Sequence, residues 1–291
     1  MPEPNCPLCG SNDNQKRFAT NGYDVLSCNV CELLFISPYP SNIKARYVTV
    51  SDASFSEMDV IGPQKHYLAS QKYYGRIFPL IEQECKAARS VLDVGCGTGY
   101  LLQLMGKYPD MRRVGIELNS ARAQFAQNKA SCEIHQTPIE EFSADTKFDV
   151  ITLINVLSHI PSFDRLFGAI HSLLSENGKV IFKVGEMCKD VQRGSIFDWS
   201  VPDHVHFLGL NTMDFICRKY GFAISAHRRI PLSEELFTPT KFKTHGRSLI
   251  RNIVKVSLAY TPLALWILKK AYEIRYGKMV YSSFIVLTRR T

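Results

Sequence analysis

From residue 64 to its end, the chain alternates short apolar runs with longer segments of helical periodicity. Short apolar runs are typical of strands buried on both faces of a parallel sheet, and apolar steps of three and four are typical of helices packed on it. We therefore predict an α/β fold: a Rossmann-like, seven-stranded, mostly parallel sheet with helices on both faces. The predicted strands are 91–94, 113–117, 132–135, 148–154, 179–184, 222–227 and 279–288, the predicted helices are 64–85, 100–108, 119–128, 163–175 and 211–219, and Asn177-Gly178 predicts a turn.

Two parts of the chain depart from this alternation. Prolines and a loss of apolar periodicity predict a linker over 41–63, so residues 1–40 are expected to form a small module before a main domain at 64–291. Within the main domain, residues from about 240 to 278 read as a basic helical insertion. Pro262 is expected to divide its helical part into two.

Four cysteines near the N-terminus have metal-ligand spacing. Cys6 and Cys9 form one CxxC pair, and Cys28 and Cys31 form a second pair, with 18 residues between the two pairs. Each pair can place two thiolates on a tight turn, so that four converge on one zinc ion, and Gly10 supplies a permissive backbone after the first pair. With four protein ligands such a zinc would be structural; the alternative is a redox or unused set of cysteines.

The stretch 91–100 reads as a ligand-binding loop. An apolar strand containing Asp93 runs directly into Gly95, Gly97 and Gly99, and an apolar helix follows without a spacer. Glycine allows a sharp turn and a close approach of the backbone to a ligand, and the amino terminus of the next helix would point at the loop. A tight strand-to-helix turn with nothing bound is the alternative.

These residues resemble class I S-adenosylmethionine-dependent methyltransferases, over roughly residues 65–291. The first motif of that family reads as Val91 to Gly99 does, and the second ends in an acidic residue like Glu117. The resemblance implies that the glycine loop receives the methionine and ribose part of S-adenosylmethionine and that Glu117 accepts hydrogen bonds from the ribose hydroxyls. It also implies that strand 279–288 lies antiparallel between the two strands before it.

The same resemblance assigns two further cofactor contacts. Many relatives carry an acidic residue near the adenine, but this chain has Thr137-Pro138, so the adenine contact is expected around Ile139. Asn155 follows strand 148–154 and is expected beside the methionine part, with His159 in the same turn. Ligands of open α/β sheets bind at this carboxyl edge.

Candidate groups for the acceptor side follow the next strand, which ends at Glu186. Residues 187–202 are irregular, charged and aromatic, and loops of this size commonly carry function. His204 and His206 come next; two apart on an extended segment, they would face one way, so either can act as general base on an acceptor hydroxyl, with Glu186 the next candidate. Alternatively, His204 anchors the loop by hydrogen bonds.

The positive charge is concentrated at the end of the chain. The net charge is +8, and residues 241–291 carry eleven Lys and Arg against one acid, +10, which leaves −2 for residues 1–240. A nucleic-acid groove at the catalytic cleft is therefore not expected. The basic segment 249–276 either lies on an anionic membrane surface or is a covering helix with a solvated face. Nine cysteines, partly in core-like segments, and no apolar run long enough to span a bilayer favour a cytoplasmic protein.

Four-cysteine modules resembling this one precede a subset of bacterial methyltransferases found with sugar and polysaccharide pathways. The shared pattern consists of Tyr23, Cys28, Cys31, Leu33, Pro38 and Pro40. The resemblance implies transfer of a methyl group to a small-molecule acceptor, first of all a sugar or nucleotide-sugar. The alternatives are an RNA methyltransferase that grips nucleic acid with the ribbon, a catalytically inactive nucleotide-binding module, and an NAD-dependent enzyme, which the glycine spacing disfavours.

Overall fold

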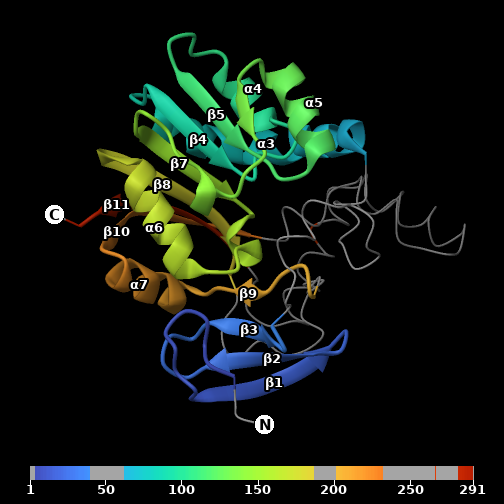
Figure 1. Ribbon diagram of the computed structural model, residues 1–291, viewed down its shortest axis with the longest axis vertical. Helices are drawn as coiled ribbons and strands as arrows, with labels where there is room; N and C mark the ends of the chain where they lie inside the picture. Colours follow the sequence, from blue (N-terminus) through green and yellow to red (C-terminus); the bar gives the residue numbers. More distant parts are fainter. Residues whose placement is uncertain (1–3, 40–61, 187–200, 232–265, 267–280, 291) are drawn as a thin grey trace, which may run out of the picture.

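The main sheet has seven strands in the order β10-β11-β8-β7-β4-β5-β6 (Figure 1). The computed structural model describes residues 4–39, 62–186, 201–231, 266 and 281–290. β11 runs antiparallel to both of its neighbours, β8 and β10, and the other pairs are parallel. This is the predicted α/β topology. The strands are β4 (Ser90–Val94), β5 (Arg112–Ile116), β6 (Glu133–His135), β7 (Phe148–Ile154), β8 (Leu174–Gly185), β10 (Phe222–Pro231) and β11 (Tyr281–Arg289).

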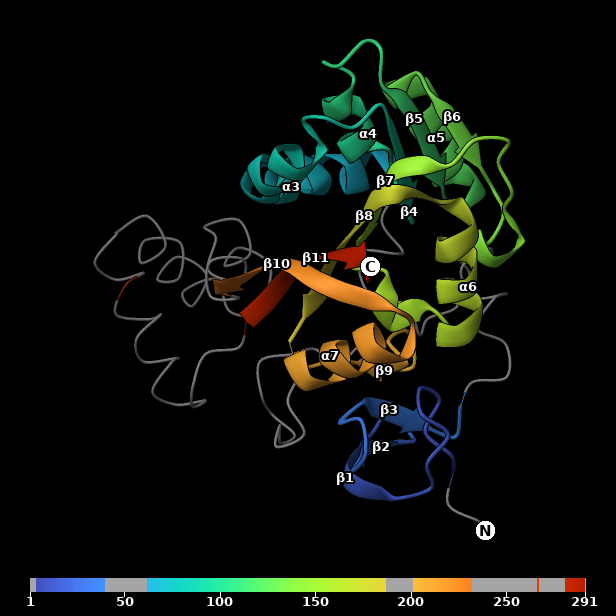
Figure 2. The ribbon, with the colours of Figure 1, turned by 90° about the vertical axis from the view of Figure 1, so that its left-hand side faces the viewer.

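Helices cover both faces of this sheet. Successive strand residues point to opposite faces, so Val91 packs with α3 and α4, whereas Leu92 packs with α6 and α7. Figure 2 shows α3 and α6 on opposite sides of the strands. The helices are α3 (Pro63–Cys85), α4 (Tyr100–Met105), α5 (Ser120–Ala130), α6 (Phe163–Leu173) and α7 (Leu210–Lys219), with short 3-10 turns η1 (Ile139–Glu141) and η2 (Leu157–His159).

The predicted turn at Asn177-Gly178 takes another form. Both residues lie within the bounds of β8, but the pairing with β7 passes from Leu174 opposite Phe148 directly to Lys179 opposite Val150. The intervening residues therefore form an irregularity in the strand pairing. The turn signal marks this interruption and not the end of a strand.

A second sheet joins the N-terminal segment to the main domain. Its order is β1 (Asn14–Thr20), β2 (Tyr23–Cys28), β3 (Leu34–Ser37) and β9 (His206–Phe207). Phe35 pairs with His206, and the Ile36 N–H donates to the Val205 oxygen at 3.2 Å. Figure 1 shows β9 on the side of β3 that faces the main domain. The sequence predicted a small N-terminal module but not this shared strand.

Side-chain contacts strengthen the junction between the two sheets. Lys219 on α7 donates to the Leu8 oxygen at 2.7 Å, and Asn211 donates to Glu32 at 2.9 Å. Leu8 and Leu33 belong to the same buried cluster as α7 residues. The linker predicted at 41–63, apart from residues 62–63, and the basic insertion at 240–278, apart from residue 266, lie outside the described residues, as do residues 187–200.

Candidate functional site

The glycine loop lies at the carboxyl end of β4. Gly95, Gly97 and Gly99 have φ values of 68°, 56° and 74°, in the left-handed region that side chains disfavour. A Cβ on Gly97 would lie 2.8 Å from His66 Cε1. The loop therefore leaves room for a ligand to approach its backbone only while this position stays glycine.

Glu117 spans from the end of β5 to the glycine loop. Its Oε2 accepts from the Gly97 N–H at 2.9 Å, and its Oε1 accepts from the Asn119 N–H at 2.8 Å. Asn119 in turn caps α5, accepting from the Arg122 N–H at 3.0 Å. The carboxylate is thus fixed beside the loop, where the sequence placed the acceptor for ribose hydroxyls.

Asp93 is buried directly beneath the loop, with 1% of its surface exposed. Its Oδ1 accepts from the Thr152 hydroxyl at 2.6 Å, whereas its Oδ2 has no hydrogen-bond partner among the described residues. Burial raises the pKa of Asp93 from 3.8 to about 7, assisted by the nearby negative charge of Glu117 and opposed by the Thr152 bond. A cationic group bound at the loop would satisfy this carboxylate.

Asn155 lies at the carboxyl end of β7 beside a buried lysine. Its φ is 59°, and its amide donates to the Tyr73 hydroxyl at 2.9 Å. Lys183 of β8 is 1% exposed, lies 3.5 Å from Asn155 Oδ1 and 3.3 Å from Ser282 Oγ, and places its Nζ 4.8 Å from the Tyr73 ring centre. The sequence pattern predicted Asn155 but not Lys183, because a single lysine in an apolar strand gives no periodic signal.

α3 supplies two side chains to this region. His66 Nδ1 lies 3.2 Å from the Thr98 hydroxyl within the glycine loop, and Tyr73 meets Asn155 as described. Their spacing of seven residues, two helical turns, puts them on one side of the helix. In the sequence this spacing is indistinguishable from that of core residues, so the sequence pattern does not predict His66 at the site.

Ile139 opens η1, after the end of β6. Its side chain is 2% exposed and packs in the core. An adenine contact at this position would therefore come from main-chain atoms or from neighbouring side chains.

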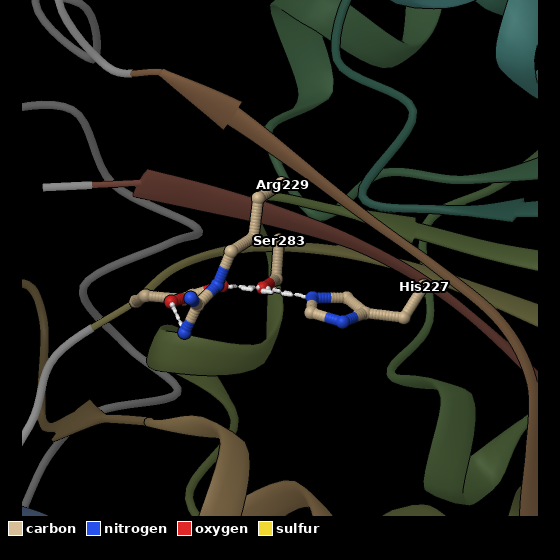
Figure 3. Close-up of polar contacts among 4 residues, drawn as sticks. His227, Arg229 and Ser283 are labelled. Atoms are coloured by element: carbon tan, nitrogen blue, oxygen red, sulfur yellow. Dashed lines mark hydrogen bonds and ion pairs between the residues drawn. The ribbon is translucent and has the colours of Figure 1, made fainter. Parts of the chain in front are cut away.

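Glu186 lies at the end of β8 in a polar network with the two adjacent strands. Arg229 contacts its carboxylate through Nε and Nη2, each at 3.0 Å, and Ser283 donates to it. His227 Nε2 lies 2.8 Å from Ser283 Oγ. Figure 3 shows Arg229, Ser283 and His227 in a row across these strands. The carboxylate is thus held in place by an ion pair and a hydrogen bond.

His204 and His206 occupy different environments. His204 is partly exposed, and its ring centre lies 4.5 Å from that of His159 on η2. His159 Nδ1 lies 3.1 Å from the Asp203 main-chain oxygen and 3.5 Å from Asp203 Oδ1. The structure therefore groups His204 with His159 and the buried Asp203.

His206 is fully buried at the junction with the small sheet. Its Nε2 lies 3.0 Å from the Ile160 main-chain oxygen and 3.0 Å from the Tyr39 hydroxyl. A carbonyl oxygen can only accept, so Nε2 carries the hydrogen. Burial lowers the pKa of His206 to about 3, which keeps the ring neutral. This environment is that of a side chain that holds two segments together.

The four N-terminal cysteines converge as their spacing predicted. Cys6 and Cys31 have their Sγ atoms 3.5 Å apart, as do Cys9 and Cys28, and all four Sγ atoms lie within 4.8 Å of one another. Four sulfurs at about 2.3 Å from a tetrahedral zinc would be about 3.8 Å apart. The described arrangement therefore fits a zinc ion closely.

Two similar turns present these cysteines. Gly10 and Glu32, each directly after the second cysteine of a pair, have φ values of 77° and 58°. The Gly10 N–H donates to the Cys6 oxygen at 2.9 Å, and the Glu32 N–H donates to the Cys28 oxygen at 3.0 Å. The sequence anticipated the permissive glycine at the first turn but not the left-handed glutamate at the second.

The predicted residues thus form three groups. Asp93, the glycines and Glu117 lie together as the predicted cofactor cradle, with Asn155 at its edge. His204 lies with His159 and Asp203, and the four cysteines lie in the small sheet region. Glu186 and His206 join none of these groups, because each is engaged in its own contacts.

Comparisons with known proteins identify a methyltransferase domain in this chain. A family model described as a methyltransferase domain matches residues 65–227. The ubiquinone biosynthesis O-methyltransferase of Pasteurella multocida is 34% identical over 110 residues, which are 32% of this chain and 45% of that protein. The Actinobacillus pleuropneumoniae protein of the same name is 28% identical over 142 residues, 45% of this chain and 56% of that protein. The chain thus spans about half the length of the curated relatives it matches.

Solved structures share the fold at low identity. The geranyl diphosphate C-methyltransferase of Streptomyces coelicolor A3(2), solved with S-adenosyl-L-homocysteine, is 14% identical with a TM-score of 0.54, covering 82% of this chain and 86% of that one. An O-methyltransferase from a Brevibacillus brevis multienzyme, also solved with S-adenosyl-L-homocysteine, is 19% identical with a TM-score of 0.50, covering 82% and 81%. With a family model spanning more than half of its length, this chain belongs to the methyltransferase domain family.

Proposed function

We propose that this protein transfers a methyl group from S-adenosylmethionine to a small-molecule acceptor. The main support for this proposal is the geometry of the cofactor cradle. One buried oxygen of Asp93 lies beneath the glycine loop without a hydrogen-bond partner among the described residues, and Glu117 accepts a hydrogen bond from the same loop. Bound S-adenosylmethionine supplies an electrophilic sulfonium methyl. Asp93 would pair with its ammonium group and Glu117 would accept from its ribose hydroxyls.

The chain's remaining task is to orient the acceptor and to accept its proton. Asn155, Tyr73 and Lys183 lie at the edge of the cradle, on the side toward β8. Of the three acceptor-side residues that the sequence suggested, His204 is the one we retain as promoting the loss of the acceptor proton, because it is partly exposed and lies against His159 and Asp203. The ion pair of Glu186 with Arg229 and the buried bond of His206 suit positioning roles.

We propose a sugar or nucleotide-sugar as the acceptor. The N-terminal cysteine pattern supports this class. So do the polar side chains at the carboxyl ends of β8 and β10 and the amino end of β11, which could bind hydroxyl groups. The named relatives act in ubiquinone biosynthesis, which makes a hydroxylated aromatic ring the competing acceptor class. Sugar acceptors and aromatic acceptors require different polar contacts, and an assay of methyl transfer to each class distinguishes them.

We propose that Cys6, Cys9, Cys28 and Cys31 hold a structural zinc ion. The Cys31 thiol donates to Cys6 and lowers the pKa of Cys6 to about 5, whereas burial raises the pKa of Cys9 to about 11. Close thiols without a cation thus cannot all ionise, and zinc would stabilise all four thiolates. Since β9 belongs to the same sheet, the ribbon would also fix the segment that carries His204.

Other proposals are weaker. An RNA acceptor would require a basic surface near the ribbon, but Lys16 pairs with Asp24 at 2.6 Å. No described helix is long and apolar enough to cross a membrane. We retain a cytoplasmic location, and peripheral membrane contact through residues 249–276, as proposals. A catalytically inactive binding module would bind cofactor without turnover.

The experiment has two stages on the full chain. Calorimetric titration with S-adenosylhomocysteine should give a dissociation constant in the micromolar range, and NAD should give no heat. Methyl transfer from labelled S-adenosylmethionine is then measured on nucleotide-sugars and on hydroxylated aromatic compounds. Absence of S-adenosylhomocysteine binding would refute the function, and turnover confined to the aromatic panel would refute the sugar assignment.

A further inference from the structure

A second group of metal-ligating side chains lies outside the cysteine cluster. His159, Asp203 and His204 each offer one ligand atom, and these atoms lie within 4.8 Å of one another. The group combines η2, directly after β7, with the segment that leads into β9. These segments are more than 40 residues apart, so the sequence alone does not bring the three side chains together.

Main-chain contacts hold the two segments in place. The Val205 N–H donates to the Ser158 oxygen at 2.9 Å, and the following residue, His206, is paired with Phe35 of β3. His159 is oriented against Asp203 through its Nδ1, 3.1 Å from the main-chain oxygen. The backbone that carries the three ligand residues is therefore held in place by hydrogen bonds. Their side chains can move toward a common metal ion without a change of fold.

We propose that His159, Asp203 and His204 bind a divalent first-row transition-metal ion. Two imidazoles and one carboxylate are the ligand types that such ions take in sites with an open position. Ligand atoms around a metal at about 2.1 Å are about 3.0–3.4 Å apart. Contraction from the described separations requires about 1 Å of side-chain movement, which the partly exposed rings of His159 and His204 allow.

The three ligand side chains differ in burial, and this difference defines the open side of the proposed metal site. Asp203 is buried, whereas both imidazoles are partly exposed, so the open side faces away from the core. Val156, which precedes η2, would lie 2.5 Å from a Cβ on Gly95, so η2 begins against the cofactor loop. η2 thus links the cofactor loop to the three ligand residues, and the proposal places the open position on the acceptor side of the cofactor cradle.

This placement deepens the proposed function, on which it rests. An acceptor hydroxyl at the open position would have its pKa lowered by the cation and would lose its proton to water. Its oxygen then forms a bond to the sulfonium methyl carbon, while the sulfur–methyl bond breaks and its electron pair stays on sulfur as the thioether of S-adenosylhomocysteine. Protons, charge and the transferred methyl group all balance.

The two proposed metal sites have different donors, which makes them separable by Co²⁺. A tetrathiolate site gives intense sulfur-to-cobalt charge-transfer absorption, and a site of nitrogen and oxygen ligands gives only weak d–d bands. The full chain is loaded with Co²⁺ under reducing conditions, and bound metal is counted by elemental analysis. We expect about two ions per chain, one with each spectrum.

Variants assign the second ion. His159→Gln and His204→Gln should each lose the weakly absorbing ion and keep the thiolate spectrum, the unfolding temperature and the affinity for S-adenosylhomocysteine. The control is His135→Gln, on β6 at the far edge of the sheet, which should keep both ions. A wild-type chain with only the thiolate ion, or a His204→Gln chain that keeps both, would overturn the metal site.

Turnover is measured with the second ion present and after its removal by a chelator too weak to strip the thiolate site. We expect turnover to fall on removal and to return with added Co²⁺ or Zn²⁺. Unchanged turnover would overturn the role of the ion in acceptor activation. Failure of S-adenosylhomocysteine to bind would instead refute the proposed function, and the metal count would be read independently of it.

Discussion

The substitution Asp93→Asn tests the cofactor cradle. It replaces a buried carboxylate whose ionisation is unfavourable in the folded protein. A pKa raised from 3.8 to about 7 means that ionising Asp93 in the folded protein costs about 4 kcal/mol more than in the unfolded chain. The folded state binds this proton more tightly, so the site's contribution to stability is present below pH 3.8 and is lost as the pH rises to about 7. The Asn variant has no such loss.

The expected results follow from that sign. Without cofactor, Asp93→Asn should gain stability relative to wild type as the pH rises from 4 to 8, by up to about 4 kcal/mol, less any weakening of the Thr152 bond. The affinity for cofactor should change with pH in the opposite direction to stability. Because the ionised carboxylate pairs with the ammonium group, wild type should bind S-adenosylhomocysteine more tightly at pH 8 than at pH 6. The variant should bind about 10–100-fold more weakly at pH 8, the range for a lost charge-assisted hydrogen bond.

Denaturant unfolding across pH and calorimetric titration at pH 6 and pH 8 provide the two readouts. Asp149→Asn is the matched control, because Asp149 lies at the opposite end of the strands, where it accepts from the Arg89 N–H at 2.8 Å. The control should lose stability and keep its cofactor affinity. Equal, pH-independent affinity in wild type and Asp93→Asn would refute the assignment of Asp93 to the ammonium group.

Three further predictions concern the cofactor loop and the cysteines. Glu117→Ala should weaken S-adenosylhomocysteine by about 1–3 kcal/mol in calorimetry because its ribose hydroxyls lose their acceptor; unchanged affinity would remove Glu117 from the site. Gly97→Val should abolish S-adenosylhomocysteine binding in a folded protein, because φ of Gly97 is 56° and a Cβ there would meet His66. The control Gly75→Val, on the exposed side of α3 where a Cβ meets nothing within 4 Å, should bind normally, and equal affinities of the two variants would contradict the prediction. Elemental analysis of protein made with zinc under reducing conditions should find zinc at the four cysteines, and its chelation should increase hydrogen exchange in β1–β3 and in β9 while β4 and β7 stay protected; a metal-free ribbon with unchanged exchange would refute the zinc proposal.

Local patterns account for the elements that the sequence predicted correctly. The strand and helix periods, the glycines at 95, 97 and 99, and the acidic end of β5 depend on neighbours a few residues apart, where backbone geometry restricts residue choice. Some ends differ: α4 stops at Met105 and not at 108, since Gly106 follows with a tight bond from its N–H to the Gln103 oxygen. The spacing of the two CxxC pairs likewise predicted correctly that the four cysteines lie close together.

The tertiary structure alone decided the environment of the acceptor-side residues. His204 and His206 are chemically identical and two positions apart, yet one lies beside His159 and the other is buried against Tyr39 and Ile160. Lys183 is a polar residue within an apolar strand, and the fold buries its side chain beside Asn155. These outcomes depend on segments 28 to 167 residues apart in the chain. Burial and pairing between distant segments set the chemistry of a side chain, and no pattern among its neighbours in sequence encodes them.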